Sequence, residues 1–249
     1  MKLSEILLFL EKTAPLCDAE EWDNCGLLIG DKDREITRAL LCLDITKEVV
    51  REARENGCEL VISHHPVIFE ALKSVSFDSA VALLLKNDIN AICMHTNLDR
   101  AENGVNTALA QALSLKDTTL YKEDFLCIGR LSAPMTAEKL ARSVKEKLSA
   151  PSVRFTDTKK PIETVAVSSG GGGAGVELYE AYGFDAFVTG ELKHHQYLFA
   201  KEKGVAAFDA GHFSTEDVVT EPLKKLLEEE FPSVGFIKSK ACVCPYRAV

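Results

Sequence analysis

One order of predicted elements occurs twice along the 249-residue chain, and this repetition constrains the fold more than any other feature. Each half has three short apolar runs separated by segments with helical spacing of apolar residues. Strands that alternate with helices are typical of a largely parallel sheet. The strands are expected at 38–44, 59–62 and 91–95, and then at 163–167, 186–189 and from 205. The sequence therefore predicts an α/β protein of two similar lobes, residues 1–124 and 125–249.

Histidine occurs six times, and all six fall into this repeat. The matched sets are His64, His65, His95 and Asp99 in the first half, and His194, His195, His212 and Glu216 in the second. In both halves a carboxylate follows the last histidine by four residues. Ligands of parallel sheets gather at the carboxyl ends of the strands. We therefore expect one site between the two lobes, with the lobes facing each other.

Five of these residues are candidate metal ligands: His64, His65, Asp99, His212 and Glu216. Imidazole and carboxylate without thiolate suit divalent Zn, Mn, Fe, Co or Ni. A carboxylate can bridge two ions about 3.5–4 Å apart, so the set predicts two ions. The alternative for an adjacent histidine pair is a hydrogen-bonded loop. His95 either ligates directly or orients Asp99, and the sequence favours the orienting role.

The remaining candidates concern catalysis and anion binding. The segment of His194 and His195 lacks the proline that follows His65. We therefore expect this second pair to bind substrate or donate protons. The glycine run 170–173 precedes a predicted helix and either binds an anion through backbone N–H groups or forms a simple tight turn.

Composition excludes several classes of protein. The net charge of −9 and the absence of a basic stripe argue against nucleic acid as a main partner. Eight cysteines without a C-x-x-C motif are typical of free thiols in a reducing compartment. The N-terminal residues lack a signal-peptide pattern, and no apolar run reaches membrane length. The sequence predicts a cytoplasmic protein without a membrane partner.

Motifs along essentially the whole chain resemble one family, the Nif-three-like dinuclear metal centre proteins, often labelled GTP cyclohydrolase I type 2 homologues. These motifs are Glu21-Trp22-Asp23-Asn24 with Gly26-Leu27, Ser63-His64-His65-Pro66, His95-Thr96-Asn97-Leu98-Asp99, Gly190-Glu191 with His194-His195, and Gly211-His212 with Glu216. As an ordered set they are far more specific than any one of them alone.

The resemblance implies two interlinked α/β/α lobes of the Nif-three-like fold and a homohexamer shaped as a torus. It also implies that the five candidate ligands hold two metal ions, with Glu216 as the bridge. Glu191 stands where the family commonly has Asp. This chain is too short for the middle domain that many members insert between the lobes.

The activity implied by the family label is hydrolytic opening of the guanine ring of GTP. An activated water would attack the ring, with His95, His194 or His195 transferring protons. Two alternatives stay open from the residues. One is a two-metal phosphoesterase, and the other is a non-enzymatic metal-binding, metal-delivery or regulatory adaptor protein. Fold and metal site together do not determine the reaction.

Overall fold

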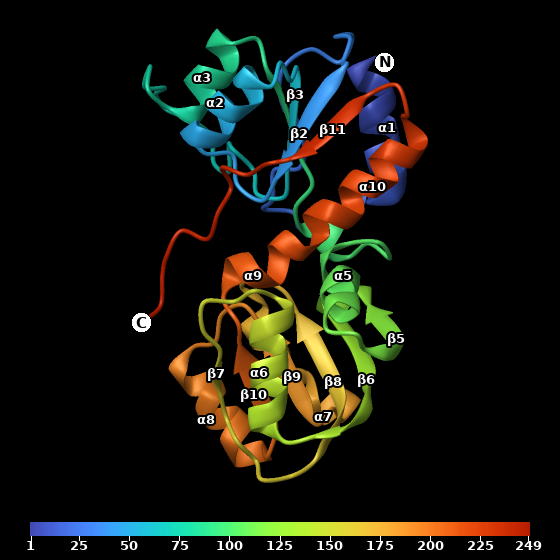
Figure 1. Ribbon diagram of the computed structural model, residues 1–249, viewed down its shortest axis with the longest axis vertical. Coiled ribbons are helices and arrows are strands. Elements are labelled where there is room, and N and C mark those ends of the chain that lie inside the picture. Colours follow the sequence, from blue (N-terminus) through green and yellow to red (C-terminus); the bar gives the residue numbers. More distant parts are fainter. The chain divides into compact units, whose positions relative to one another are not determined.

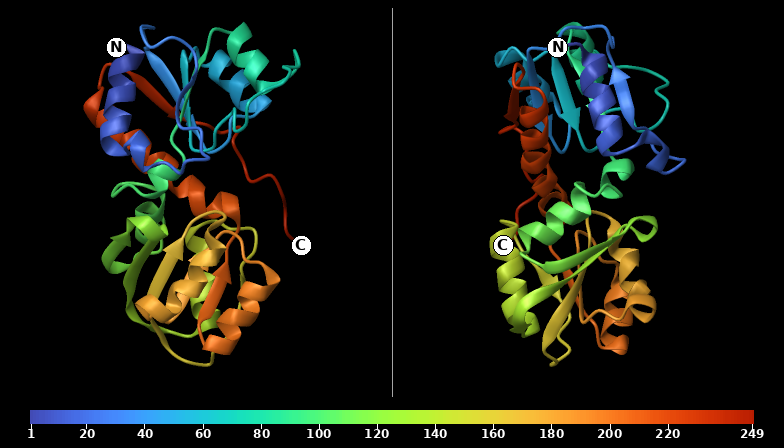
Figure 2. Two further views of the ribbon diagram at one scale, coloured as in Figure 1. Left: turned by 180° about the vertical axis from the view of Figure 1, so that it is seen from behind. Right: turned by 90° about the vertical axis from the view of Figure 1, so that its right-hand side faces the viewer.

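A computed structural model describes all residues, 1–249, and forms two compact units (Figures 1 and 2). The first unit contains residues 1–103 and 220–243, and the second contains 104–219 and 244–249. Each unit is a sheet covered by helices, so the predicted α/β class with two similar lobes is confirmed.

The division of the chain differs from the expected boundary at residue 124. The second unit begins at Gly104, because the helix α5 (Val105–Ala112) packs Leu109 into the core of the second sheet. Residues 220–243 return to the first unit, because the last strand, β11 (Gly235–Lys238), pairs with β2 (Arg38–Cys42). A boundary drawn once along the sequence cannot represent a chain that leaves a unit and returns to it.

The sheet of the first unit has the strand order β1-β4-β3-β2-β11. Its further strands are β1 (Gly26–Ile29), β3 (Leu60–Ser63) and β4 (Asn90–Cys93). Strands β11, β2, β3 and β4 are parallel, and β1 is antiparallel to β4. Cys42 pairs with Ser63, and Ser63 with Cys93, so β2, β3 and β4 end at one edge of the sheet.

Helices cover both faces of this sheet (Figure 1). They are α1 (Leu3–Thr13), α2 (Lys47–Glu55), α3 (Ala80–Lys86) and α10 (Thr220–Glu230), with the short segments η1 (Leu16–Asp18) and α4 (Thr96–Asp99). Val50 of α2 and Leu84 of α3 pack with Leu40 and Val61 of the sheet. Helices α1 and α10 lie on the opposite face, where Phe9 meets Phe231 edge-on with ring centroids 5.5 Å apart. No helix in the protein is both long and apolar enough to cross a membrane.

The carboxylate of Glu52 fastens the segment after β11 to α2. It accepts hydrogen bonds from the Ser239 hydroxyl and from the backbone N–H groups of Lys240 (2.9 Å) and Ala241 (3.1 Å). Burial raises the pKa of Glu52, but these hydrogen bonds outweigh burial and leave the pKa below its ordinary value.

Replacing Glu52 by Gln is expected to lower the free energy of unfolding by about 1–2 kcal/mol at neutral pH. A carboxyl whose pKa is depressed in the folded state stabilises the fold above its unfolded pKa, about 4.3 for Glu. The stabilisation is lost as the pH falls below that value toward the folded pKa. The difference between wild type and variant should therefore shrink below about pH 4, as measured by urea unfolding at several pH values. A difference that grows toward acid pH would contradict this role.

The sheet of the second unit has the strand order β5-β6-β8-β9-β10-β7. The strands are β5 (Lys116–Tyr121), β6 (Leu126–Met135), β7 (Arg154–Phe155), β8 (Ile162–Ser168), β9 (Ala186–Thr189) and β10 (Ala206–Asp209). Strands β8, β9 and β10 are parallel, and the other neighbours are antiparallel. Ser168, Thr189 and Asp209 are paired in register, so the three parallel strands also end at one edge.

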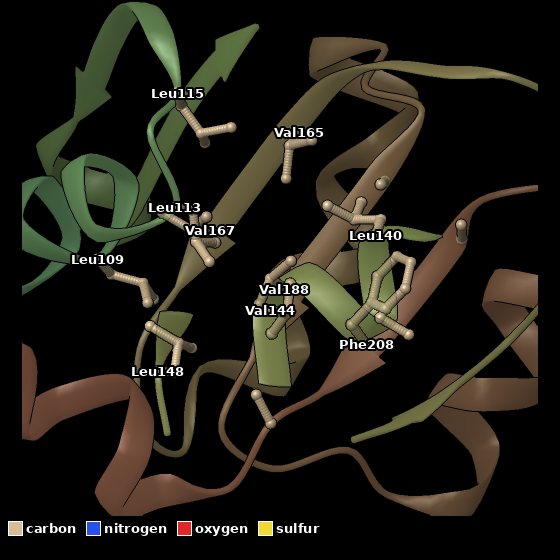
Figure 3. Packing of buried hydrophobic residues seen from close by; sticks show 14 of the residues in the cluster. Leu109, Leu113, Leu115, Leu140, Val144, Leu148, Val165, Val167, Val188 and Phe208 are labelled. Carbon is tan, nitrogen blue, oxygen red and sulfur yellow. The ribbon is translucent and has the colours of Figure 1, made fainter. Parts of the chain in front are cut away.

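Two apolar clusters cover the faces of the second sheet. On one face, Leu140 and Val144 of α6 (Ala137–Lys147) pack with Val188 and Phe208 (Figure 3). On the other, Phe187 packs with residues of η3 (Gly172–Leu178), α7 (Tyr179–Tyr182) and α8 (His194–Lys203). The remaining short segments are η2 (Lys122–Asp124), α9 (His212–Glu216) and η4 (Asp217–Val219).

Candidate metal centre

Three imidazoles gather at the carboxyl edge of the first sheet. His64 and His65 follow β3 directly, and His95 follows β4 after one residue. One ring nitrogen from each lies within 4.8 Å of the others. The ring centroids of His64 lie 5.1 Å from those of His65 and of His95, and the last two are 5.4 Å apart. The parallel register of β3 and β4 is what brings the His pair and His95 together.

An oxygen that can only accept a hydrogen bond orients each ring. Nδ1–H is donated by His64 to the Met94 carbonyl at 2.8 Å, by His65 to Asp44 at 2.7 Å and by His95 to Asp23 at 2.9 Å. Because a neutral imidazole carries one proton, donation from Nδ1 leaves the lone pair on Nε2. Metal-binding histidines are held in this way, with the second nitrogen bonded to a carboxylate or carbonyl. The donor set therefore fits a divalent metal through three Nε2 atoms.

Asp23 is the most heavily engaged of these acceptors. Its side chain is fully buried and accepts from His95, from both the N–H and the hydroxyl of Thr96, and from the N–H of Asn24. Burial raises the pKa of Asp23, but the hydrogen bonds from His95 and Thr96 outweigh it and hold the pKa well below its usual range. Asp23 therefore stays ionised as it accepts the hydrogen bond from His95.

The sequence pattern by itself indicates no role for Asp23 or Asp44. Asp23 entered only as part of a motif, and Asp44 only as the end of a strand. Asp44 lies two residues beyond β2, at the same sheet edge as His65. That position was a usable signal, because carboxyl ends of neighbouring parallel strands share one edge.

Asp99 is the fourth candidate ligand of the first unit, and with His64, His65 and His95 it forms the first ligand group. It ends α4, and its Oδ1 lies 3.7 Å from Nε2 of His64. The expected role of His95 was to orient Asp99. In the structure Nδ1 of His95 donates to Asp23 and the ring lies with those of His64 and His65, so His95 joins the candidate ligands, and its role toward Asp99 stays a prediction.

The second unit presents its own imidazole–carboxylate pair at the matching sheet edge. His212 and Glu216 begin and end α9, one helical turn apart, with Nε2 and Oε2 separated by 2.9 Å. Nδ1 of His212 lies 2.8 Å from Oε1 of Glu191, so a carboxylate faces each nitrogen of this ring. Glu191 thus lies against Nδ1 of a candidate ligand, as Asp23 and Asp44 do in the first unit.

Close packing accounts for three of the four glycines in the run 170–173. Gly170 has φ +52°, and a Cβ there would lie 1.7 Å from Oε1 of Glu216. A Cβ on Gly172 would lie 2.1 Å from the Ser168 hydroxyl, and one on Gly173 2.2 Å from the Glu191 carbonyl. The tight turn, one of the two interpretations that the sequence left open, is the one that these contacts favour.

The sequence repeat aligns His194 and His195 with His64 and His65, but the two pairs occupy different positions relative to the strands. Ser63 and Thr189 occupy equivalent ends of β3 and β9, so the position of His65 corresponds to that of Glu191. His194 and His195 are instead exposed residues that open α8. Their predicted part in substrate binding or proton transfer stays a prediction.

Comparisons with known proteins agree with this architecture. A sequence model of the family Duf34/NIF3 (NGG1p interacting factor 3) matches residues 1–244. The chain belongs to the Duf34/NIF3 family. This match confirms the family that the sequence motifs resemble.

Similar proteins cover nearly the full length of the chain. The "GTP cyclohydrolase 1 type 2 homolog" of Clostridium perfringens is 32% identical and covers 100% of both chains. The protein of the same name from Campylobacter jejuni is 36% identical over 92% of both. The crystal structure of Staphylococcus aureus protein SA1388 superposes with a TM-score of 0.94 at 32% identity, covering 100% of this chain and 99% of that chain.

Proposed function

We propose that this NIF3-family chain binds two divalent metal ions and hydrolyses a small substrate with their help. The observation that carries the proposal is the set of three imidazoles whose Nδ1–H groups are all held by oxygen acceptors. A bound divalent ion would supply Lewis-acid activation of water or of a substrate oxygen. The proposed ligands are His64, His65, Asp99, His212 and Glu216, with His95 added by the geometry and Glu216 as the bridge.

The chain's own residues fix the orientation of these ligands. Asp23 and Asp44 each hold one imidazole through Nδ1, which keeps Nε2 as the ligand atom. Glu191 contacts Nδ1 of His212 and limits rotation of that ring. Proton transfer is proposed for His194 and His195, whose exposure leaves them accessible to solvent and substrate.

The names of the relatives support a nucleotide substrate, since two of them are called GTP cyclohydrolase 1 type 2 homolog. The test incubates metal-loaded protein with a panel of nucleotides and phosphoesters and identifies products by mass spectrometry. Opening of a purine ring supports the cyclohydrolase assignment, whereas release of phosphate identifies a phosphoesterase. Metal binding without any turnover would favour a delivery or adaptor protein.

Metal content tests the dinuclear site directly. Purified protein loaded with Zn or Mn and then desalted is expected to retain about two ions per chain, because the proposed imidazole and carboxylate ligands suit a bridged pair. Elemental analysis per mole of protein measures this number. One ion per chain would remove the bridging role of Glu216, and none in a folded sample would remove the proposal.

A homohexameric ring is proposed from the family resemblance. Closed assemblies repeat one interface by symmetry, so a single discrete mass is expected rather than a concentration-dependent series. Light scattering coupled to size exclusion should give about six times the chain mass of 27.3 kDa. A stable monomer with full metal content would show that the site forms without a ring.

A further inference from the structure

Two exposed aromatic side chains border the first ligand group. Trp22, the only tryptophan of the chain, is 59% exposed, and Phe69 is 49% exposed. Their ring centroids lie 5.8 Å apart. The centroid of His95 lies 6.2 Å from that of Trp22 and 6.4 Å from that of Phe69. Large apolar surfaces therefore adjoin a candidate metal ligand and face solvent.

Polar contacts of neighbouring residues hold the two rings in place. Asp23, directly after Trp22, is anchored by its buried carboxylate. The side-chain amide of Asn24 donates to the Ile68 carbonyl at 2.6 Å, which ties this loop to the segment of Phe69. A site held in place before binding loses less conformational entropy when a ligand arrives.

A role of Trp22 and Phe69 in holding the His95 ring in place does not by itself explain why so much of both aromatic rings is exposed. Both rings meet the imidazole at steep angles, 76° for Trp22 and 79° for Phe69. Such edge contacts need only part of each ring, yet more than half of the Trp22 surface is exposed. Exposed aromatic surface next to a polar site is typical of ligand binding.

We propose that Trp22 and Phe69 bind a planar heteroaromatic ring of the substrate next to the metal ligands. This inference rests on the proposed function and adds the residues that would bind the ring of its substrate. Aromatic side chains stack on planar rings with little dependence on the identity of the ring. Exposed Glu21 and Glu70 adjoin the two aromatics in the sequence, so the anionic part of a substrate is disfavoured here and the ring is the part that binds.

The test measures binding of adenosine and guanosine to the zinc-loaded full chain by equilibrium dialysis, with ribose as the ring-free control. Trp22→Leu and Phe69→Leu are each expected to weaken nucleoside binding about tenfold, since stacking is lost while apolar volume is kept. Trp22→Phe should retain most of the binding. The matched control is Phe77→Leu, because Phe77 is 98% exposed and makes no part of the aromatic pair. Quenching of the single tryptophan in the wild type gives a second, direct readout.

Three outcomes would overturn the ring-binding role. One is wild-type protein that binds nucleosides no better than ribose, and another is unchanged binding in Trp22→Leu. The third is loss of zinc in Trp22→Leu and Phe69→Leu, which would make the rings structural supports of His95. Zinc content is measured separately in every sample. A wild-type chain that holds no zinc would therefore remove the proposed function, whereas zinc-loaded protein without nucleoside affinity removes only this inference.

Discussion

Replacing His64 by Ala is expected to remove the metal bound by the first ligand group while the chain stays folded. His64 is 3% exposed, its Nδ1 bonds to the Met94 carbonyl and its Nε2 lies 3.7 Å from Asp99. Loss of the ligand should lower metal affinity by more than the roughly 10–100-fold that follows loss of an orienting partner. Loss of the hydrogen bond to Met94 should cost about 1–3 kcal/mol of stability, because the carbonyl is left without this donor.

The matched controls for His64 are His194→Ala and His195→Ala. Both residues are exposed at the start of α8, so neither change should alter metal content or the free energy of unfolding beyond about 0.5 kcal/mol. Elemental analysis and circular dichroism on all three variants make the comparison. A fall in metal content in the His194 and His195 variants would show that the second pair also binds metal. That result would contradict the assignment of metal binding to His64 and His65 alone among the two pairs. Impaired turnover with unchanged metal would support their part in catalysis.

Replacing Gly170 by Ala is expected to displace the carboxylate of Glu216 and to abolish its part in metal binding. The new methyl group would lie 1.7 Å from Oε1 of Glu216 and 3.0 Å from Nε2 of His212, so at least one of them must move. The backbone adds a second penalty. At φ +52° a residue with a Cβ costs about 1–2 kcal/mol more than glycine.

The neighbouring Gly171 provides a matched control for this change. It has φ −74°, and a Cβ there would meet nothing within 4 Å. Gly171→Ala is therefore expected to leave metal content unchanged and to alter stability by less than about 1 kcal/mol. Urea unfolding and elemental analysis of the two variants separate backbone strain from loss of the ligand. Full metal content in a folded Gly170→Ala protein would exclude Glu216 as a bridging ligand.

Much of the architecture could be read from the sequence, because local patterns carry it. Short apolar runs alternating with helical spacing predict parallel strands, and this alternation needs no knowledge of distant contacts. The same patterns place His64, His65 and His95 at strand ends. The candidate metal site followed from that placement, since parallel strands present their carboxyl ends at a common edge.

Other features depended on contacts between distant residues. The pairing of β11 with β2 returns residues 220–243 to the first unit, and no local sequence pattern predicts that pairing. Asp23 lies 72 residues before His95 in the chain, yet its buried carboxylate orients that ring. The role of Glu191 likewise appears only once α9 brings His212 to within 2.8 Å of it.

The sequence by itself determined which residue types could bind metal and on which strand ends they would lie. Only the tertiary structure decided which carboxylate holds which imidazole, and why glycine is required at 170. The physical reason is that strand and helix signals arise from side-chain periodicity within about ten residues. Hydrogen bonds such as that between His65 and Asp44, and steric limits such as that at Gly170, arise from packing that the sheet register sets.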